Sequence, residues 1–168
     1  VVSKTVTPDL KNENNVLLVL GHTACEFGAS HLEKIMELSS RGAVPAFDTT
    51  APIRYRALHE AIQSGLIASC HDISEGGIAV AVAEMAIGGC LGVDMSACRT
   101  AGDASWLFSE SNGRFIVEVT PENMSEVMSR FPDACSQLGS VTCRDALTFT
   151  GNDEVSLTEL RHVWMTQQ

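Results

Sequence analysis

The chain has 168 residues, of which 45 % are hydrophobic and 19 % are charged, and its formal net charge is −10. This length suits one domain with a substantial core. The acidic balance argues against a nucleic-acid-binding groove and against a basic face for anionic membranes. No apolar run approaches the length that crosses a bilayer.

The cysteines stand at positions 25, 70, 90, 98, 135 and 143. Their spacing contains no C-x-x-C pair, which argues against a zinc site. No signal peptide is visible, so we expect the six thiols to be reduced, as in a cytoplasmic protein.

Residues 1–15 are expected to be a mobile start or a linker from something upstream. Their KNENN stretch is polar and has no hydrophobic period. A chain that opens on VVSKTV, without methionine, is expected to be a piece of a longer polypeptide. The domain itself is predicted over residues 16–168.

The apolar run at 16–20, VLLVL, predicts a central strand that is covered on both faces. Further strands are predicted from short apolar or alternating runs at 66–70, 91–95, 106–108, 114–119, 137–142 and 146–150. Helices are predicted from helical spacing and from Gly and Pro near their ends, over 30–38, from 48 or 50 to 64, and over 78–87, 121–131 and 158–164. The alternation predicts an α/β (α+β) fold, with a mixed β-sheet flanked by helices.

The stretch Cys70–Gly89 organises the rest of the chain. Within it, residues 78–87 carry one polar side chain, Glu84, and this helix is therefore predicted to be buried on every face. We expect Glu84 to pair with a basic group or with the backbone, because a lone buried carboxylate is costly.

A polar turn precedes this helix and contains Asp72, Ser74 and Glu75, followed by Gly76 and Gly77. The glycines open the first N–H groups of the helix to close approach, and the helix dipole favours negative charge there. One interpretation is therefore a phosphate or carboxylate site. The other is structural: Ser74 caps the helix, Asp72 bonds to backbone N–H groups, and the glycines allow a tight turn.

A second polar stretch, SESNGR, carries Ser109, Glu110, Ser111 and Arg114. Its hydroxyls, carboxylate and amide can bind polar groups of a ligand, and Arg114 offers a planar fork that suits phosphate or carboxylate. The alternative is an Arg114–Glu110 pair that closes the loop. No G-x-S-x-G elbow is present, and no cysteine has a recognisable catalytic context, so no catalytic residue is assigned.

Both stretches also carry a family resemblance. HDISEGGIAVAVAEMAIGG, followed by LGVDM and then by LFSESNGRFIVEV, resembles the C-terminal domain of the phosphoribosylformylglycinamidine synthase family (large subunit), within the aminoimidazole ribonucleotide synthetase-like superfamily. LLVLGHTACEFGAS resembles the family's stretch between its two domains, and LTELRHVW resembles its terminal helix. The resemblance covers nearly the whole chain.

The resemblance implies an ATP-dependent ligase of purine biosynthesis. Such an enzyme converts formylglycinamide ribonucleotide to formylglycinamidine ribonucleotide, with ammonia from glutamine and with magnesium assisting ATP. The residues implied in holding a substrate or nucleotide phosphate are Ser74, Gly76 and Gly77, and those implied in lining or bracing the same cleft are Ser109, Glu110, Ser111 and Arg114. Asp72 and Glu75 join these candidates because they lie in the same polar turn. The family's catalytic and metal-binding residues belong to its other domain.

The implied partners are an N-terminal ATP-binding domain of the same polypeptide, a glutaminase subunit or domain, and the ribonucleotide. ATP and Mg²⁺ are expected in the full-length enzyme and not on this chain alone, which we expect to be inactive. Cut from its partner, the chain is expected to form a homodimer through an exposed apolar face.

Two alternatives stay open. One is a non-catalytic binding or scaffold module with the same fold. The other is a sibling enzyme of the superfamily, such as aminoimidazole ribonucleotide synthetase, selenophosphate synthetase or thiamine-monophosphate kinase.

Overall fold

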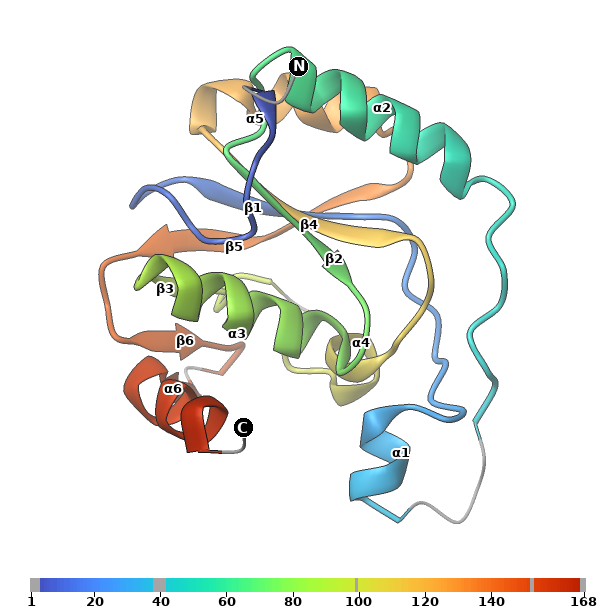
Figure 1. Ribbon diagram of the computed structural model, residues 1–168, viewed down its shortest axis with the longest axis vertical. Coiled ribbons are helices and arrows are strands. Elements are labelled where there is room, and N and C mark those ends of the chain that lie inside the picture. Colours follow the sequence, from blue (N-terminus) through green and yellow to red (C-terminus); the bar gives the residue numbers. More distant parts are fainter. Residues whose placement is uncertain (1–3, 38–41, 99, 152, 167–168) are drawn as a thin grey trace.

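A computed structural model of the chain describes residues 4–37, 42–98, 100–151 and 153–166. Its centre is a seven-stranded sheet in the order β2-β4-β1-β5-β3-β6-β7 (Figure 1). The strands are β1 Val16–Leu20, β2 Ser69–Ile73, β3 Gly92–Asp94, β4 Arg114–Val119, β5 Cys135–Thr142, β6 Ala146–Thr148 and β7 Glu154–Ser156. The pair β3–β6 is parallel and the other neighbouring strands of this sheet are antiparallel, so the predicted mixed sheet is confirmed.

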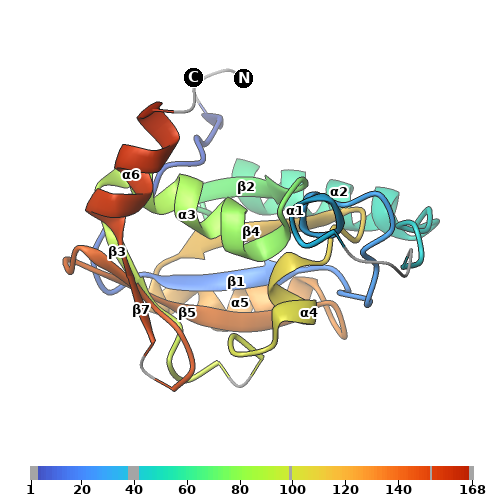
Figure 2. The same ribbon diagram turned by 90° about the horizontal axis from the view of Figure 1, so that it is seen from below.

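Helices cover both faces of this sheet (Figures 1 and 2). They are α1 His31–Ile35, α2 Ala51–Gln63, α3 Gly77–Gly89, α4 Ala104–Phe108, α5 Pro121–Arg130 and α6 Leu157–Thr166. α2 and α5 pack on one face, whereas α3, α4 and α6 pack on the other. The α/β architecture predicted from the alternation of elements is therefore present.

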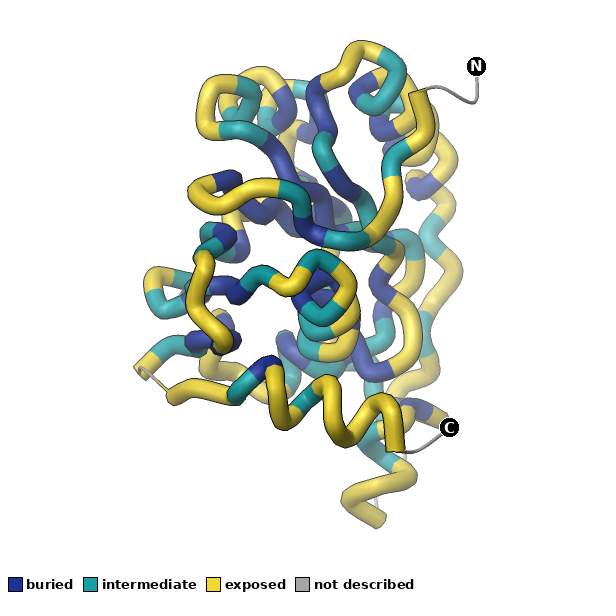
Figure 3. The backbone as a smooth tube through the Cα atoms, turned by 60° about the vertical axis from the view of Figure 1, so that its left-hand side comes forward, coloured by how far each residue is buried: buried dark blue, intermediate teal, exposed yellow. Residues whose placement is uncertain are grey.

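Strand β1 is buried on both faces, as its continuous apolar run predicted. Leu17 and Val19 pack in the core on the α3 side. Val16, Leu18 and Leu20 pack in the core on the side of α2 and α5. Buried residues lie along the central strands, and exposed residues lie on the outer helices and loops (Figure 3).

Several predicted elements are corrected. The strand predicted at 106–108 is wrong, because these residues end the short helix α4, whose cap Asp103 accepts a hydrogen bond from the Ser105 N–H at 2.8 Å. Strand β2 begins three residues later than predicted, and β7 was missed because EVS is short and two of its three residues are polar. Helix α1 ends at Ile35, and position 38, where its end was predicted, lies outside the described residues.

The described part of the expected linker packs on the domain. Leu10 is 2 % exposed, and its N–H donates to the Met85 carbonyl of α3 at 3.1 Å. The N–H groups of Lys11 and Asn12 donate to Glu118 of β4. The mobile start expected for this segment does not fit these contacts, and where the domain begins in a longer chain stays a prediction.

Helix α3 is not buried on every face, so that prediction is wrong. Its buried residues are Gly77, Ile78, Ala81, Val82, Met85 and Ala86. Val80, on another side, is 40 % exposed. That side of α3 and the facing side of α6 line an apolar groove of about 370 Å³ that includes Phe108 and Trp164. No helix in the described part of the chain is both long and apolar enough to cross a membrane.

Candidate functional site

Three loops meet at one edge of the sheet. Strands β1 and β2 both run antiparallel to β4, so that Leu20 is paired with Phe115 and Ile73 with Arg114. The ends of β1 and β2 therefore lie beside the start of β4. We call the loops at this edge, residues 21–30, 74–77 and 109–113, the loop cluster.

The turn that contains Gly76 and Gly77 lies in this cluster, but the N–H groups of these two glycines are hydrogen-bonded within the protein. Gly76 and Gly77 have φ angles of 77° and 68°, which an L side chain rarely adopts. The Gly76 N–H donates to Oε1 of Glu110 at 2.9 Å, and the Gly77 N–H donates to the Ser74 carbonyl at 3.2 Å. The prediction that these two groups are unpaired is therefore wrong. A carboxylate of the protein itself holds the position predicted for a ligand's anion.

The structural interpretation of the turn is correct in part. Gly76 is the N-cap of α3, no side chain caps the helix, and the expected capping by Ser74 is therefore wrong. Both glycines make the tight turn through their positive φ angles. A Cβ on Gly77 would lie 2.6 Å from the Leu107 carbonyl oxygen, so this glycine also allows the backbone of α4 to approach.

Glu110 connects two helix starts. Its Oε1 accepts the His31 N–H of α1 at 3.0 Å in addition to the Gly76 N–H of the α3 turn. Its side chain is 15 % exposed, and the same oxygen lies 3.7 Å from Nδ1 of His31. The carboxylate thereby fixes α1 and the glycine turn relative to the 109–113 loop.

Arg114 is an internal brace of the loop that precedes it. The residue is 1 % exposed, and its Nε donates to the Ser111 carbonyl at 2.9 Å. Its Nη1 donates to Oγ1 of Thr23 at 2.9 Å, and its Nη2 donates to the Ser109 carbonyl. Burial lowers the pKa of Arg114 to about 10, and the nearby charge of Glu26 opposes that change. The predicted Arg114–Glu110 pair is wrong, and the guanidinium binds this loop from within.

The two serines of SESNGR are also buried, and their hydroxyls form hydrogen bonds with other parts of the protein. Ser109 is 0 % exposed and Ser111 is 4 % exposed. The Ser111 hydroxyl accepts the Ala24 N–H at 3.0 Å and donates to Oε2 of Glu26. The Ser109 hydroxyl accepts the Glu26 N–H at 3.3 Å. Both side chains therefore attach the 109–113 loop to the loop that follows β1.

Three of the predicted site residues do present exposed side chains, namely Asp72, Ser74 and Glu75. Oδ1 of Asp72 lies 3.4 Å from Nδ1 of His71, and Oε2 of Glu75 lies 3.8 Å from Nε2 of His31. On its other side, His71 Nε2 lies 2.9 Å from Oε2 of Glu84. The expectation that Glu84 pairs with a basic group is therefore confirmed, although its side chain is 43 % exposed.

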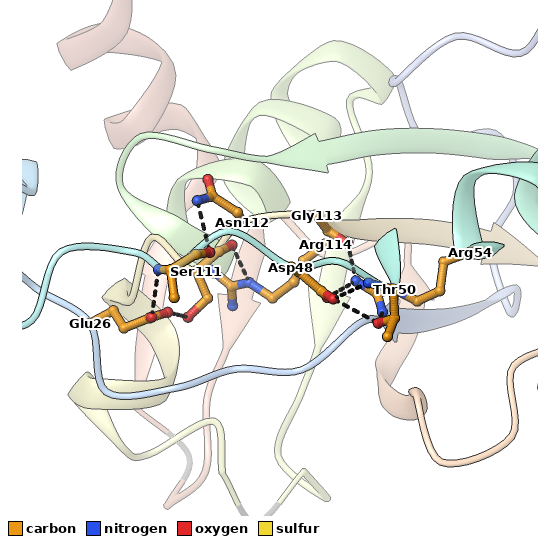
Figure 4. Close-up of polar contacts among 9 residues, drawn as sticks. Glu26, Asp48, Thr50, Arg54, Ser111, Asn112, Gly113 and Arg114 are labelled. Carbon is orange, nitrogen blue, oxygen red and sulfur yellow. Dashed lines mark hydrogen bonds and ion pairs between the residues drawn. The ribbon is translucent and has the colours of Figure 1, made fainter. Parts of the chain in front are cut away.

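Sequence reasoning missed the residues that surround the 109–113 loop on its other side (Figure 4). Arg54 of α2 is buried, and it donates to the Gly113 carbonyl at 3.3 Å and to Oγ1 of Thr50 at 2.9 Å. It also pairs with the carboxylate of Asp48. The only sequence signal was a basic residue on the inner side of an amphipathic helix, a position where an arginine must find partners.

The Asp48 carboxylate is expected to make the stability of the fold depend on pH. Its hydrogen bond from the Thr50 hydroxyl, and then its bond from Arg54, hold the pKa of Asp48 well below its usual range. A depressed folded-state pKa stabilises the fold above the unfolded-state pKa, and this stability is lost as the pH falls through the folded-state pKa. Asp48→Asn should therefore be less stable than wild type at pH 7. The difference in the free energy of unfolding between wild type and Asp48→Asn should narrow as the pH falls below about 4. The midpoints of urea unfolding of both proteins, at pH 7 and below about pH 4, measure this difference. A difference that does not change with pH would contradict the prediction.

Within residues 4–37, 42–98, 100–151 and 153–166, no three His, Cys, Asp or Glu side chains are grouped so that they could hold a metal ion. The side chains exposed at the turn include two carboxylates, Asp72 and Glu75. Such groups accept hydrogen bonds from the donors of a ligand and repel its phosphates. The exposed hydroxyl of Ser74 can donate to a phosphate oxygen.

Known proteins share this fold. Phosphoribosylformylglycinamidine synthase (PurL) of Thermotoga maritima, in a complex with FGAR, is 18 % identical with a TM-score of 0.77, covering 94 % of this chain and 29 % of that chain. Another structure, of synthase II from the same organism, is 17 % identical with a TM-score of 0.74, covering 94 % and 28 %. The hydrogenase maturation protein HypE of E. coli is 18 % identical with a TM-score of 0.62, covering 90 % and 51 %.

The chain thus spans less than a third of the synthase chains and about half of HypE. At these identities the likeness shows the fold. The family is shown separately, by a sequence model described as AIR synthase related protein, C-terminal domain, which matches residues 12–152. The chain therefore belongs to the family of AIR synthase related proteins and represents their C-terminal domain.

Proposed function

We propose that this chain is the C-terminal domain of an ATP-dependent ligase that converts formylglycinamide ribonucleotide to formylglycinamidine ribonucleotide. The observation that carries the proposal is the bond of 2.9 Å between Glu110 and the Gly76 N–H. It joins the two stretches that resemble the synthase family into one unit at one edge of the sheet. The similar T. maritima proteins include complexes with FGAR and with ATP.

In this proposal the residues divide into two groups. Ser109, Glu110, Ser111 and Arg114 form the framework, because their polar atoms bond to the protein's own loops. The exposed hydroxyl of Ser74 donates to a ligand oxygen, and the exposed carboxylates of Asp72 and Glu75 accept from ligand hydroxyl or amide groups. The framework thus holds the exposed residues at the rim of a cleft that a second domain completes.

ATP and Mg²⁺ are implied by this function, but the residues of this chain do not fit them. The described residues contain no grouped carboxylates for a metal ion, and the Arg114 guanidinium already donates to the 109–113 loop and to Thr23. Phosphoryl transfer to an oxygen would require residues that hold a metal-bound triphosphate. We therefore assign both to an N-terminal ATP-binding domain of the same polypeptide, with ammonia from a glutaminase. The chain alone is then inactive.

A second candidate is a non-catalytic module of the same fold. It is favoured by one observation: the N–H groups of Gly76 and Gly77, and the fork of Arg114, are all bonded to the protein itself. A module of this kind would keep the loop cluster as a purely structural unit.

Ser74→Asp separates the two candidates. Adding a like charge at an exposed position beside a phosphate is expected to weaken binding about tenfold or more, whereas Ser125→Asp, exposed on α5 and away from the cluster, should not. The measurement is calorimetric titration with formylglycinamide ribonucleotide, with the ATP-binding domain supplied. Heat that is lost in Ser74→Asp and kept in Ser125→Asp supports the ligase domain. No heat from wild type under these conditions favours the module, and ribonucleotide-dependent ATP hydrolysis by this chain alone would contradict its inactivity.

A further inference from the structure

Residues 42–50, which we call the strap, run along the outer side of the 109–113 loop without regular secondary structure. The Gly28 N–H donates to the Ala43 carbonyl at 2.9 Å, and Nδ2 of Asn112 donates to the Ala46 carbonyl at 3.2 Å. Figure 4 shows the strap between Glu26 and Arg54. These hydrogen bonds link the strap to two separate loops, and each can be tested separately.

Glu26 bridges the strap and the loop through its two carboxylate oxygens. Oε1 accepts the Ala46 N–H of the strap at 2.9 Å, and Oε2 accepts the hydroxyl of Ser111. These partners are 20 residues downstream and 85 residues downstream of Glu26. The bridge thus joins segments that nothing in the local sequence brings together.

The backbone of Glu26 contacts the same loop. Its N–H donates to Oγ of Ser109 at 3.3 Å, and its carbonyl accepts the Glu110 N–H at 3.4 Å. Glu110 in turn accepts the Gly76 N–H with its side chain. A continuous set of hydrogen bonds therefore leads from the strap, through Glu26 and the 109–113 loop, to the turn that carries Ser74.

We propose that Glu26 is a positioning residue, which holds the strap and the 109–113 loop as one rigid unit and thereby fixes the turn at 74–77. The first part concerns the chain itself. The last step, from the turn to a bound ribonucleotide, rests on the proposed function. Glu26 acts through Ser111 and Glu110 and is not assigned a contact with the ligand.

Hydrogen exchange of the backbone amides of this chain tests the rigid unit. Glu26→Ala should raise exchange in residues 42–50 and 109–113 together, by about tenfold or more, and leave β1 and β5 unchanged. Glu26→Gln should restore most of the protection, because the amide oxygen accepts from the Ala46 N–H and the amide NH₂ donates to the Ser111 hydroxyl. Glu126→Ala, which removes an exposed carboxylate paired with Arg130 on α5, should change neither segment.

Three results would overturn the proposal. They are unchanged exchange in either segment of Glu26→Ala, exchange raised equally across the whole sheet, and a Gln variant no better protected than the Ala variant. A residue that only contributed to global stability would give the second result. Selective exchange that glutamine rescues is therefore specific to positioning.

The step to the ligand is tested in the polypeptide that carries both domains. Glu26→Ala should raise KM for formylglycinamide ribonucleotide about tenfold, with kcat changed by no more than about threefold, because it loosens a binding turn and not the reacting groups. An active wild-type enzyme whose KM is unchanged by Glu26→Ala would overturn this step. If wild type shows no such activity, the proposed function fails, and the exchange measurement still decides the role of Glu26.

Discussion

Replacing Glu118 by alanine is expected to lower the free energy of unfolding by about 3–5 kcal/mol. This β4 side chain is 0 % exposed. Its two oxygens accept hydrogen bonds from the Lys11 N–H at 2.9 Å, the Asn12 N–H at 3.0 Å, Nδ2 of Asn15 at 2.7 Å and Oγ of Ser69 at 2.9 Å. Alanine would leave these four donors without their acceptor at a site that water reaches poorly. Urea unfolding of the chain, followed by circular dichroism, measures the loss.

Two further variants control this measurement. Glu118→Gln keeps the volume but turns an NH₂ group toward N–H donors, so it should be less stable than wild type and more stable than Glu118→Ala. Glu60→Ala, exposed on α2, should change stability by no more than about 0.5 kcal/mol. A Glu118→Ala protein as stable as Glu60→Ala would show that this hydrogen-bonded cluster contributes little to the fold.

Glu118 also shows how far the sequence predicts the fold and where it stops. The alternation in RFIVEV places Phe115, Val117 and Val119 on one face of β4, and all three pack in the core with α2 and α5. The same alternation places Glu118 on the opposite face, where a carboxylate indicates solvent. Residues 10–15 cover that position instead, and a contact across more than 100 residues leaves no trace in the local pattern.

The candidate site was likewise predicted only in part, because local pattern does not show long-range contacts. The two polar stretches could be found from the sequence, because their composition is unusual and they follow or precede clear apolar runs. Their roles could not, because the side chains of Ser111 and Glu110 find their partners in segments that lie far away along the chain. Arg114 likewise bonds to the distant Thr23, and its other two bonds are to carbonyls of the 109–113 loop. An arginine fork and a helix start suit an anion whether it is a ligand's phosphate or the protein's own carboxylate, and residue type alone does not distinguish the two.

Gly77→Ala is expected to destabilise the chain by about 3 kcal/mol or more, because two effects add. The φ angle of Gly77 is +68°, which strains any L side chain. In addition, a Cβ there would lie 2.6 Å from the Leu107 carbonyl oxygen and 2.7 Å from the Ser109 carbonyl oxygen. Both atoms are backbone, so neither can move aside without shifting α4 and the 109–113 loop. The free energy of unfolding in urea measures the effect.

Gly65→Ala is the matched control, because Gly65 has a φ angle of +75° and nothing lies within 4 Å of the place that its Cβ would take. It should cost about 1–2 kcal/mol, which is the strain of the left-handed conformation alone. The difference between the two variants therefore measures how closely α4 and the loop press on the start of α3. Equal losses would mean that the approach of the Leu107 and Ser109 carbonyl oxygens to Gly77 is not tight. A larger loss of stability for Gly77→Ala means that the fold requires glycine at this position. A substitution of Gly77 then reports on packing. Ligand binding must be tested at an exposed neighbour such as Ser74.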